Sequence, residues 1–200
     1  MRHLCRMFVM LGLLAGSSML CAQDNESTLR VKLVTSAGDI TLRLYPEKSP
    51  VTVENFLAYV DSGFYNGTIF HRVISNFMVQ GGGFTTAMTE KVSGEPIVNE
   101  SRNKLHNIRG TVAMARTSDP DSATAQFFIN QRSNLQLDWA PGKEGYTVFG
   151  EVVKGMGVVD FIATADTDTG LMTTGAGQRP FQDVPVEAIV IEEIVRVRGK

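Results

Sequence analysis

The chain has 200 residues, of which 43% are apolar and 20% are charged, and this composition fits one compact domain with a sizeable core. The formal net charge is −2; setting aside Arg2 and Arg6 near the N-terminus leaves 17 basic against 21 acidic residues, a net charge of −4. Such mild acidity argues against a nucleic-acid partner and against an anionic membrane surface.

The first 22 residues predict a secretory signal peptide. Met1–Arg6 is basic, Met7–Leu20 is apolar, and the small residues around Cys21 and Ala22 offer a cleavage site before Gln23. The apolar run is short for a membrane span, so we expect a cleaved leader and no membrane contact afterwards. Lipid attachment at Cys21 is an alternative that the bulky residues before it disfavour.

Both cysteines, Cys5 and Cys21, lie in this leader. The mature chain is therefore expected to have no disulfide, no thiol nucleophile and no thiolate metal ligand. It retains only His71 and His106, which makes a histidine-rich metal site an unfavourable interpretation. We expect no cofactor and no metal.

Residues 23–28 are polar and predict a flexible tail, after which a hairpin is expected. Leu29–Thr35 and Ile40–Tyr45 alternate in polarity on either side of a Ser-Ala-Gly-Asp turn. A helix should follow, with Thr52 as its N-cap and a stop near Gly63. Its apolar residues recur at helical spacing and are expected to face the core: Val53, Phe56, Leu57 and Val60.

Two short apolar runs, Ile69–Ile74 and Phe77–Val79, predict a second hairpin around a Ser-Asn turn. Simple alternation places Phe70, Arg72 and Ile74 on one face, unless a bend re-aims one of them. Arg72 is unusual among so many apolar neighbours, because an arginine that is buried without an acceptor is costly. One interpretation is that Arg72 has a structural role at the rim of a barrel. The functional interpretation is that Arg72 is a fixed cation beside the aromatic and thioether surface of Phe77 and Met78.

Further short strands are expected along the rest of the chain. Phe127 and Phe128 should face opposite ways. The expected elements are a polar loop at Thr86–Gly94, strands at Pro96–Asn99, Thr111–Arg116, Gln126–Ile129 and Tyr146–Val153, a helix at Met156–Thr164, a loop at Asp166–Gly177 and a closing strand at Val186–Val197. Many short strands with two helices and no βαβ rhythm predict a mainly β fold, a closed antiparallel barrel.

Three blocks of sequence resemble the cyclophilins, the peptidyl-prolyl cis-trans isomerases. They are FHRVISNFMVQGGGFT (Phe70–Thr85), GTVAMARTSDPDSATAQFFIN (Gly110–Asn130) and GYTVFGEVVKG (Gly145–Gly155), in the family's order and spacing. The resemblance covers about Leu29 to Val197, and it is greatest to the bacterial exported kind. It implies a cyclophilin-like domain at 29–198, an eight-stranded closed barrel with a helix at each open end, and a location in the periplasm or secreted beyond it.

The resemblance also assigns site residues. It implies that Arg72, Gln80 and Phe128 are catalytic, with Arg72 as the hydrogen-bond donor and Gln80 orienting it or holding the substrate backbone. Phe77, Met78 and Leu137 would line a proline pocket together with Phe128. Ala115, Arg116, Gln126 and Tyr146 would contact the rest of the substrate. Without the resemblance, core packing is the default interpretation of Met78 and Phe128.

Rotation about an X-Pro bond requires no covalent chemistry. The barrier of ~18–20 kcal/mol reflects amide resonance, which is lost as the C–N bond twists. A hydrogen bond to the prolyl nitrogen stabilises that twisted state, and a guanidinium donates it without a change of protonation. An arginine beside an apolar pocket is therefore sufficient in principle.

Some positions depart from the family pattern. Gly83 stands where an acidic residue is common, and Tyr146 stands where eukaryotic members carry a histidine. Gln136 takes the place of the indole that many eukaryotic members use to bind cyclosporin, and Trp139 is three positions away. We therefore expect weak or no cyclosporin binding.

Other functional classes have less support. The sequence has no G-x-S-x-G elbow, and its glycine-rich stretches lack the ending of a phosphate loop. The expected partners are proline-containing polypeptide clients, and the chain is expected to be a monomer. The remaining alternative is a non-catalytic chaperone or adaptor that binds proline segments.

Overall fold

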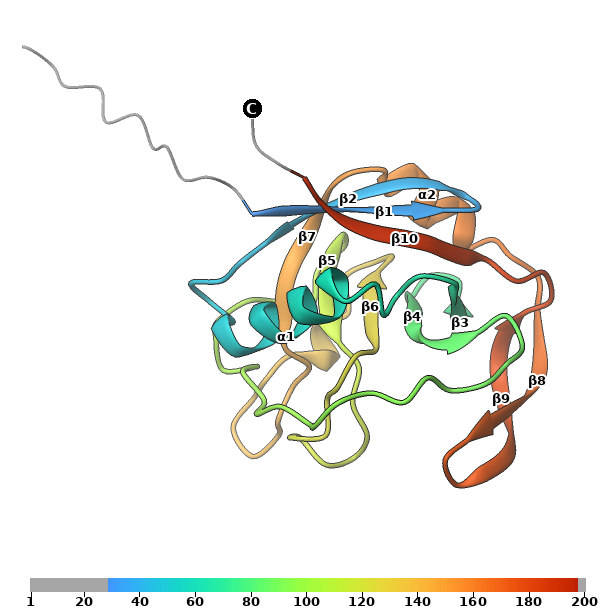
Figure 1. The fold of residues 1–200 in the computed structure, drawn as a ribbon. Coiled ribbons are helices and arrows are strands. Elements are labelled where there is room, and N and C mark those ends of the chain that lie inside the picture. Colours follow the sequence, from blue (N-terminus) through green and yellow to red (C-terminus); the bar gives the residue numbers. More distant parts are fainter. Residues whose placement is uncertain (1–28, 198–200) are drawn as a thin grey trace, which may run out of the picture.

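The structure is a computed structural model that describes residues 29–197 (Figure 1). The predicted signal peptide, residues 1–22, and the predicted tail, residues 23–28, lie outside the described residues. Eight antiparallel strands close into a barrel in the order β1-β10-β3-β4-β6-β5-β7-β2, which confirms the predicted fold class. The barrel strands are β1 (Arg30–Thr35), β2 (Gly38–Leu44), β3 (Thr68–Ile74), β4 (Met78–Thr85), β5 (Thr111–Met114), β6 (Phe127–Asn130), β7 (Val148–Lys154) and β10 (Val190–Val197).

The predicted first hairpin forms, and the closing strand pairs with it edge to edge. Val31 pairs with Leu42 and Leu33 with Ile40, so the apolar residues of β1 and β2 share the inner face. β10 pairs with β1 on its other side and with β3, which closes the barrel. β10 begins at Val190, four residues later than the sequence pattern predicted.

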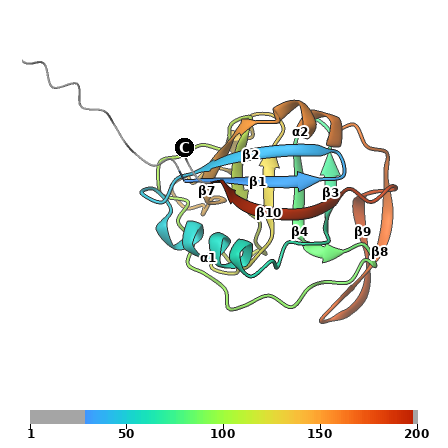
Figure 2. The same ribbon diagram turned by 45° about the horizontal axis from the view of Figure 1, so that its top comes forward.

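The two helices, α1 (Pro50–Asp61) and α2 (Met156–Ile162), lie on opposite sides of the strands in both views (Figures 1 and 2). The predicted N-cap of α1 was wrong, because the cap is Ser49 and Pro50 follows it. Proline suits a first helical position, since its missing N–H has no partner there in any case. Thr52 lies in the first turn instead, where its hydroxyl donates to Glu100 at 2.7 Å.

The barrel core is the main cluster of buried apolar side chains inside the strands. The predicted stripe of α1 belongs to it, and Phe56 packs with its ring centroid 5.1–5.6 Å from those of Tyr65, Phe127 and Phe149. Tyr65 donates its buried hydroxyl to the carbonyl of Ala125 at 2.8 Å. Aromatic side chains therefore link α1 to the barrel interior.

The loop predicted at Asp166–Gly177 is wrong, because this segment begins a β-hairpin. β8 (Thr167–Thr174) and β9 (Gly177–Pro185) form a two-stranded sheet beside the barrel (Figure 2). Met172 and Val184 bury themselves against Ile69 and Phe84 of the barrel, and this packing stabilises strands whose Asp, Thr and Gly content suggested a loop. The strand expected at Pro96–Asn99 is reduced to one isolated bridge at Ile97.

No helix among residues 29–197 is long and apolar enough to cross a membrane.

Candidate active site

The hairpin of β3 and β4 positions the predicted catalytic arginine. Phe70 pairs with Gly81 and Arg72 pairs with Gln80, so His71 is an extra residue that has no partner on β4. This bulge reverses the alternation: Phe70 belongs to the barrel core, whereas Arg72 points to the outer face. The expectation that both lie on one face was wrong for that reason.

The structure brings nine of the ten predicted site residues into one cavity of about 120 Å³, called here the Arg72 cavity. They come from β3, β4 and β6, from the turn between β3 and β4, from the segments after β5 and before β7, and from the short 3-10 turn Leu135–Leu137. The lining residues are Arg72, Phe77, Met78, Gln80, Ala115, Arg116, Phe128, Leu137 and Tyr146. A guanidinium therefore faces a small space that has apolar walls.

The apolar walls are themselves packed. Met78 and Phe128 are 2% and 3% exposed, and they form a second cluster with Ala113 and Val148 that is separate from the barrel core. The ring of Tyr146 lies edge-on to Phe128 at 5.6 Å between centroids. This support fixes the shape of the cavity before any ligand arrives.

The tenth predicted residue, Gln126, lies in a neighbouring space. Gln126 lines an adjoining cavity of about 260 Å³ that shares Gln80, Ala115 and Arg116 with the Arg72 cavity. The side chain of Gln80 donates to the amide oxygen of Gln126 at 3.0 Å. Arg72 and Gln80 are paired across β3 and β4, but no side-chain hydrogen bond joins them among the described residues, so the predicted orienting role of Gln80 has no side-chain contact to support it.

Gly83 lies against the side chain of Gln126. A Cβ at this position would lie 2.5–2.7 Å from Cγ, Cδ and Nε2 of Gln126, so this flexible side chain would have to shift. The glycine therefore lets Gln126 keep the conformation in which it accepts a hydrogen bond from Gln80.

Arg116 stiffens the rim of the cavity. Its guanidinium lies 4.5 Å from the centre of the Tyr146 ring and donates to the carbonyls of Glu144 and Gly145 at 2.8 and 3.2 Å. A third nitrogen donates to the carbonyl of Thr117 at 2.9 Å, so three acceptors and an aromatic face hold the guanidinium. Arg116 thus fixes both Tyr146 and the chain that leads into β7.

His71 is buried beside Arg72, and burial is the main reason that its pKa is lowered to about 4; the nearby Arg72 charge lowers it further. The ring is therefore neutral near pH 7. Its Nε2 lies 3.4 Å from the Nε2 of Gln80, and its Nδ1 has no hydrogen-bond partner in the described part of the chain. A buried, neutral ring fits a structural role for His71 rather than that of a general base.

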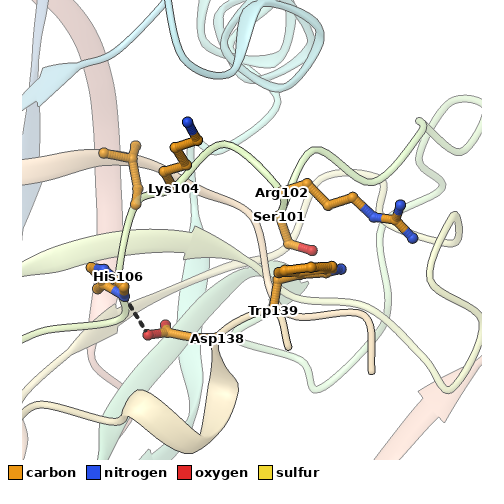
Figure 3. Close-up of a pocket in the computed structure, with 7 residues that line it drawn as sticks. Ser101, Arg102, Lys104, His106, Asp138 and Trp139 are labelled. Atoms are coloured by element: carbon orange, nitrogen blue, oxygen red, sulfur yellow. Dashed lines mark hydrogen bonds and ion pairs between the residues drawn. The ribbon is translucent and has the colours of Figure 1, made fainter. Parts of the chain in front are cut away.

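Trp139 lines a different cavity, of about 400 Å³ (Figure 3). The guanidinium of Arg102 lies 5.4 Å from the centre of its ring, and His106 Nδ1 lies 2.7 Å from an oxygen of Asp138 nearby. Neither Trp139 nor Gln136 lines the Arg72 cavity. The larger of these two cavities therefore contains none of the predicted site residues.

Sequence reasoning missed Asp183. Its carboxylate oxygen Oδ2 lies 3.7 Å from Nε of Arg72, and it is the one ion-pair partner of Arg72 within residues 29–197. Asp183 lies in β9, inside the hairpin that the sequence failed to predict. No spacing signal links two residues that are this far apart in the chain.

For metal ions, the region 29–197 contains no group of three or more His, Cys, Asp or Glu side chains placed to hold one.

Comparison with known proteins places this architecture in a family. Residues 30–194 match the family described as cyclophilin type peptidyl-prolyl cis-trans isomerase/CLD. Peptidyl-prolyl cis-trans isomerase A of Dickeya dadantii is 52% identical over 166 residues, covering 83% of each chain. Peptidyl-prolyl cis-trans isomerase B of Escherichia coli is 51% identical over 164 residues, covering 80% of this chain and 94% of that one.

A solved structure agrees with the sequence comparisons. The cyclophilin type peptidyl-prolyl cis-trans isomerase of Cryptosporidium parvum superposes with a TM-score of 0.69 at 26% identity, covering 86% of this chain and 99% of that chain. The predicted resemblance to the cyclophilin family is thus confirmed by sequence and by fold. The chain belongs to the cyclophilin-type peptidyl-prolyl cis-trans isomerase family.

Proposed function

We propose that this protein catalyses rotation about X-Pro peptide bonds in the Arg72 cavity. Arg72 donates a hydrogen bond to the prolyl nitrogen, and the proline ring rests against Phe77, Met78, Phe128 and Leu137. The observation that carries the proposal is the meeting of one guanidinium and these apolar walls in a cavity of about 120 Å³. That space suits a ring of proline size rather than a large ligand.

The energetics fit such a simple site. Only contacts that strengthen as the amide twists increase the rate, and the prolyl nitrogen becomes a good acceptor only when resonance is lost. The hydrogen bond from Arg72 is therefore selective for the twisted state. Each ~1.36 kcal/mol of such selectivity gives a tenfold gain in rate.

The substrate class is a polypeptide. The Cryptosporidium parvum relative was also solved in the presence of the dipeptide Ala-Pro, at 27% identity and a TM-score of 0.68 to this chain. Here Ala115 and Arg116 lie between the Arg72 cavity and the cavity of Gln126, so they would contact residues before the proline. No cofactor takes part in this mechanism.

The predicted signal peptide indicates the cellular location in which the enzyme would act. A signal peptide at residues 1–22 would place the enzyme in the periplasm, where its clients are unfolded or partly folded exported proteins. Expression in a Gram-negative host followed by N-terminal sequencing of the periplasmic fraction tests this, and a mature end at Gln23 is the expected result. An uncleaved chain in the cytoplasm contradicts the proposed location but leaves the activity proposal intact.

The activity itself is tested with a short X-Pro peptide and the chain from Gln23. Uncatalysed exchange takes tens to hundreds of seconds, so modest catalysis is visible. We expect Arg72→Ala to lower kcat/KM by about 10²–10³-fold, the range typical of removing one transition-state donor. Arg30→Ala, an exposed arginine at the start of β1, is the matched control and should leave kcat/KM unchanged.

The same assay separates the alternative function. If the native protein binds the peptide but does not accelerate exchange, the chain is a proline-segment chaperone or adaptor and Arg72 serves recognition only.

Two further expectations concern partners. Cyclosporin should inhibit weakly or not at all, since no indole lines the Arg72 cavity. Gel filtration of the chain from Gln23 should give a monomer.

A further inference from the structure

The hairpin β8–β9 brings a carboxylate to the proposed catalytic arginine. Asp183 Oδ2 lies 3.7 Å from Arg72 Nε, and the two side chains are 37% and 41% exposed. The contact is made at Nε, and the two terminal nitrogens of the guanidinium have no hydrogen-bond or ion-pair partner within residues 29–197. The same arginine lines the Arg72 cavity, so the ion pair lies at its edge.

The hairpin is held against the barrel beside β3. Val184, the residue after Asp183, is buried with Ile69 and Phe84, and the rings of Phe84 and Phe181 lie 5.4 Å apart. Phe84 also packs against His71, with ring centroids 4.7 Å apart. Apolar contacts on both sides of Asp183 therefore fix its position relative to the β3 bulge.

Asp183 lies in a bulge of its own. Val184 pairs with Asp168 and Phe181 pairs with Gly170, so Gln182 and Asp183 together oppose a single residue of β8. The backbone of Asp183 has φ +62°, in the left-handed region that few residues other than glycine adopt. Bulges beside active sites re-aim side chains, and here the bulges of β3 and β9 turn Arg72 and Asp183 toward each other.

We infer that Asp183 is a positioning residue that holds the guanidinium of Arg72 in the orientation needed to reach the prolyl nitrogen. The inference rests on the proposed isomerase function. Without the carboxylate, the arginine side chain samples more rotamers, since no side-chain hydrogen bond from Gln80 restrains it among residues 29–197. The contribution to folding is small, because half-exposed ion pairs contribute at most about 1 kcal/mol to stability.

The test compares Asp183→Asn with the native chain from Gln23 in the X-Pro exchange assay. Asparagine keeps the shape and tolerates positive φ, so the hairpin should remain folded. We expect kcat to fall about threefold to fivefold with KM unchanged, in keeping with the size of a half-exposed ion pair. Asp168→Asn, which removes an exposed carboxylate from the facing strand, is the matched control and should leave kcat unchanged.

Salt supplies a readout that a purely structural role does not move. The Debye length falls from about 10 Å at 0.1 M to about 3 Å at 1 M salt. The native kcat should therefore decline toward the Asp183→Asn value as salt rises, while the kcat of the variant stays flat.

Three results would overturn the inference: an unchanged or raised kcat for Asp183→Asn, an equal loss for Asp168→Asn, or equal salt dependence of the native protein and the Asp183→Asn variant. An inactive native protein contradicts the proposed function instead. Activity that depends on Arg72 but not on Asp183 contradicts only the positioning role.

Discussion

Phe127 and Phe128 are neighbours in β6, yet they belong to two different regions of the molecule. Phe127 is fully buried in the barrel core against Phe56 and Tyr65, whereas Phe128 packs on the outer face and lines the Arg72 cavity. The two side chains have the same chemistry and nearly the same burial. The two residues differ in their surroundings: Phe127 is enclosed by aromatic rings, whereas Phe128 lines a cavity that also contains a guanidinium.

This comparison shows that burial alone does not identify function in this barrel. No buried residue of the barrel core lines the Arg72 cavity or the cavity of Gln126, so we expect the core to act through stability. The cluster of Met78, Ala113, Phe128 and Val148 is buried as well, but one side of it is the wall of the Arg72 cavity. Substitutions in the two regions should therefore separate loss of stability from loss of activity.

The largest effect is expected from Phe127→Ala. Removing a fully buried phenyl ring costs about 3–5 kcal/mol, because the transfer free energy is lost and a cavity remains. Urea unfolding should show this loss, while kcat/KM at a temperature where the variant is folded should stay within about threefold of the native value. A loss of kcat/KM in a folded variant greater than tenfold would show that the barrel core and the Arg72 cavity are coupled.

A second prediction concerns His71, the buried residue in the chain between Phe70 of the barrel core and Arg72 of the Arg72 cavity. Burial lowers the pKa of His71 to about 4 from an ordinary 6.5. Between pH 4 and pH 6.5 the unfolded chain therefore binds a proton at His71 that the folded chain does not bind. The free energy of unfolding should therefore be highest above about pH 6.5 and should fall by about 3 kcal/mol as the pH drops to 4, because of His71. Urea unfolding of the native protein and of His71→Gln at pH 7 and pH 4.5 measures the difference.

The control for His71 places the same amide at an exposed position and removes no titratable group. Thr86 is exposed in the turn after β4, so Thr86→Gln should leave the pH dependence of unfolding unchanged. Several carboxylates also lose ion pairs in acid, and for this reason only the difference in pH dependence between native protein and variant is informative. Equal pH dependence for the native protein and His71→Gln would show that His71 does not exclude a proton in the folded state.

Alternation in the sequence was sufficient to separate the two phenylalanines. It placed Phe127 and Phe128 on opposite faces, and the structure confirms this because β6 is regular through both. It failed for Phe70 and Arg72, since the bulge at His71 inserts a residue that a strict two-residue period does not contain. Family resemblance named the residues of the Arg72 cavity, but residue patterns alone did not bring β3, β6 and Leu137 together.

The hairpin β8–β9 was missed for a different reason. Its sequence is rich in Asp, Thr and Gly, and the few apolar residues that anchor it, such as Met172 and Val184, find their partners on β3 and β4. Those contacts are tertiary, so a local pattern does not contain them. Asp183 was missed with the hairpin, because its role depends on the bulge that turns it toward Arg72.

The smallest of these effects in free energy, and the most specific one, is expected from Phe128→Ala. Losing the ring removes apolar surface that would cover the proline, and about 1.5–3 kcal/mol of burial corresponds to a loss of roughly tenfold to a hundredfold in kcat/KM. The loss of stability should be smaller than for Phe127→Ala, because the space that remains opens into an existing cavity. Phe128→Leu should restore part of the activity by refilling the wall. Phe128→Ala could instead unfold as readily as Phe127→Ala and still isomerise the peptide at the native rate. The side chain of Phe128 would then contribute only to stability, and the proline would bind elsewhere.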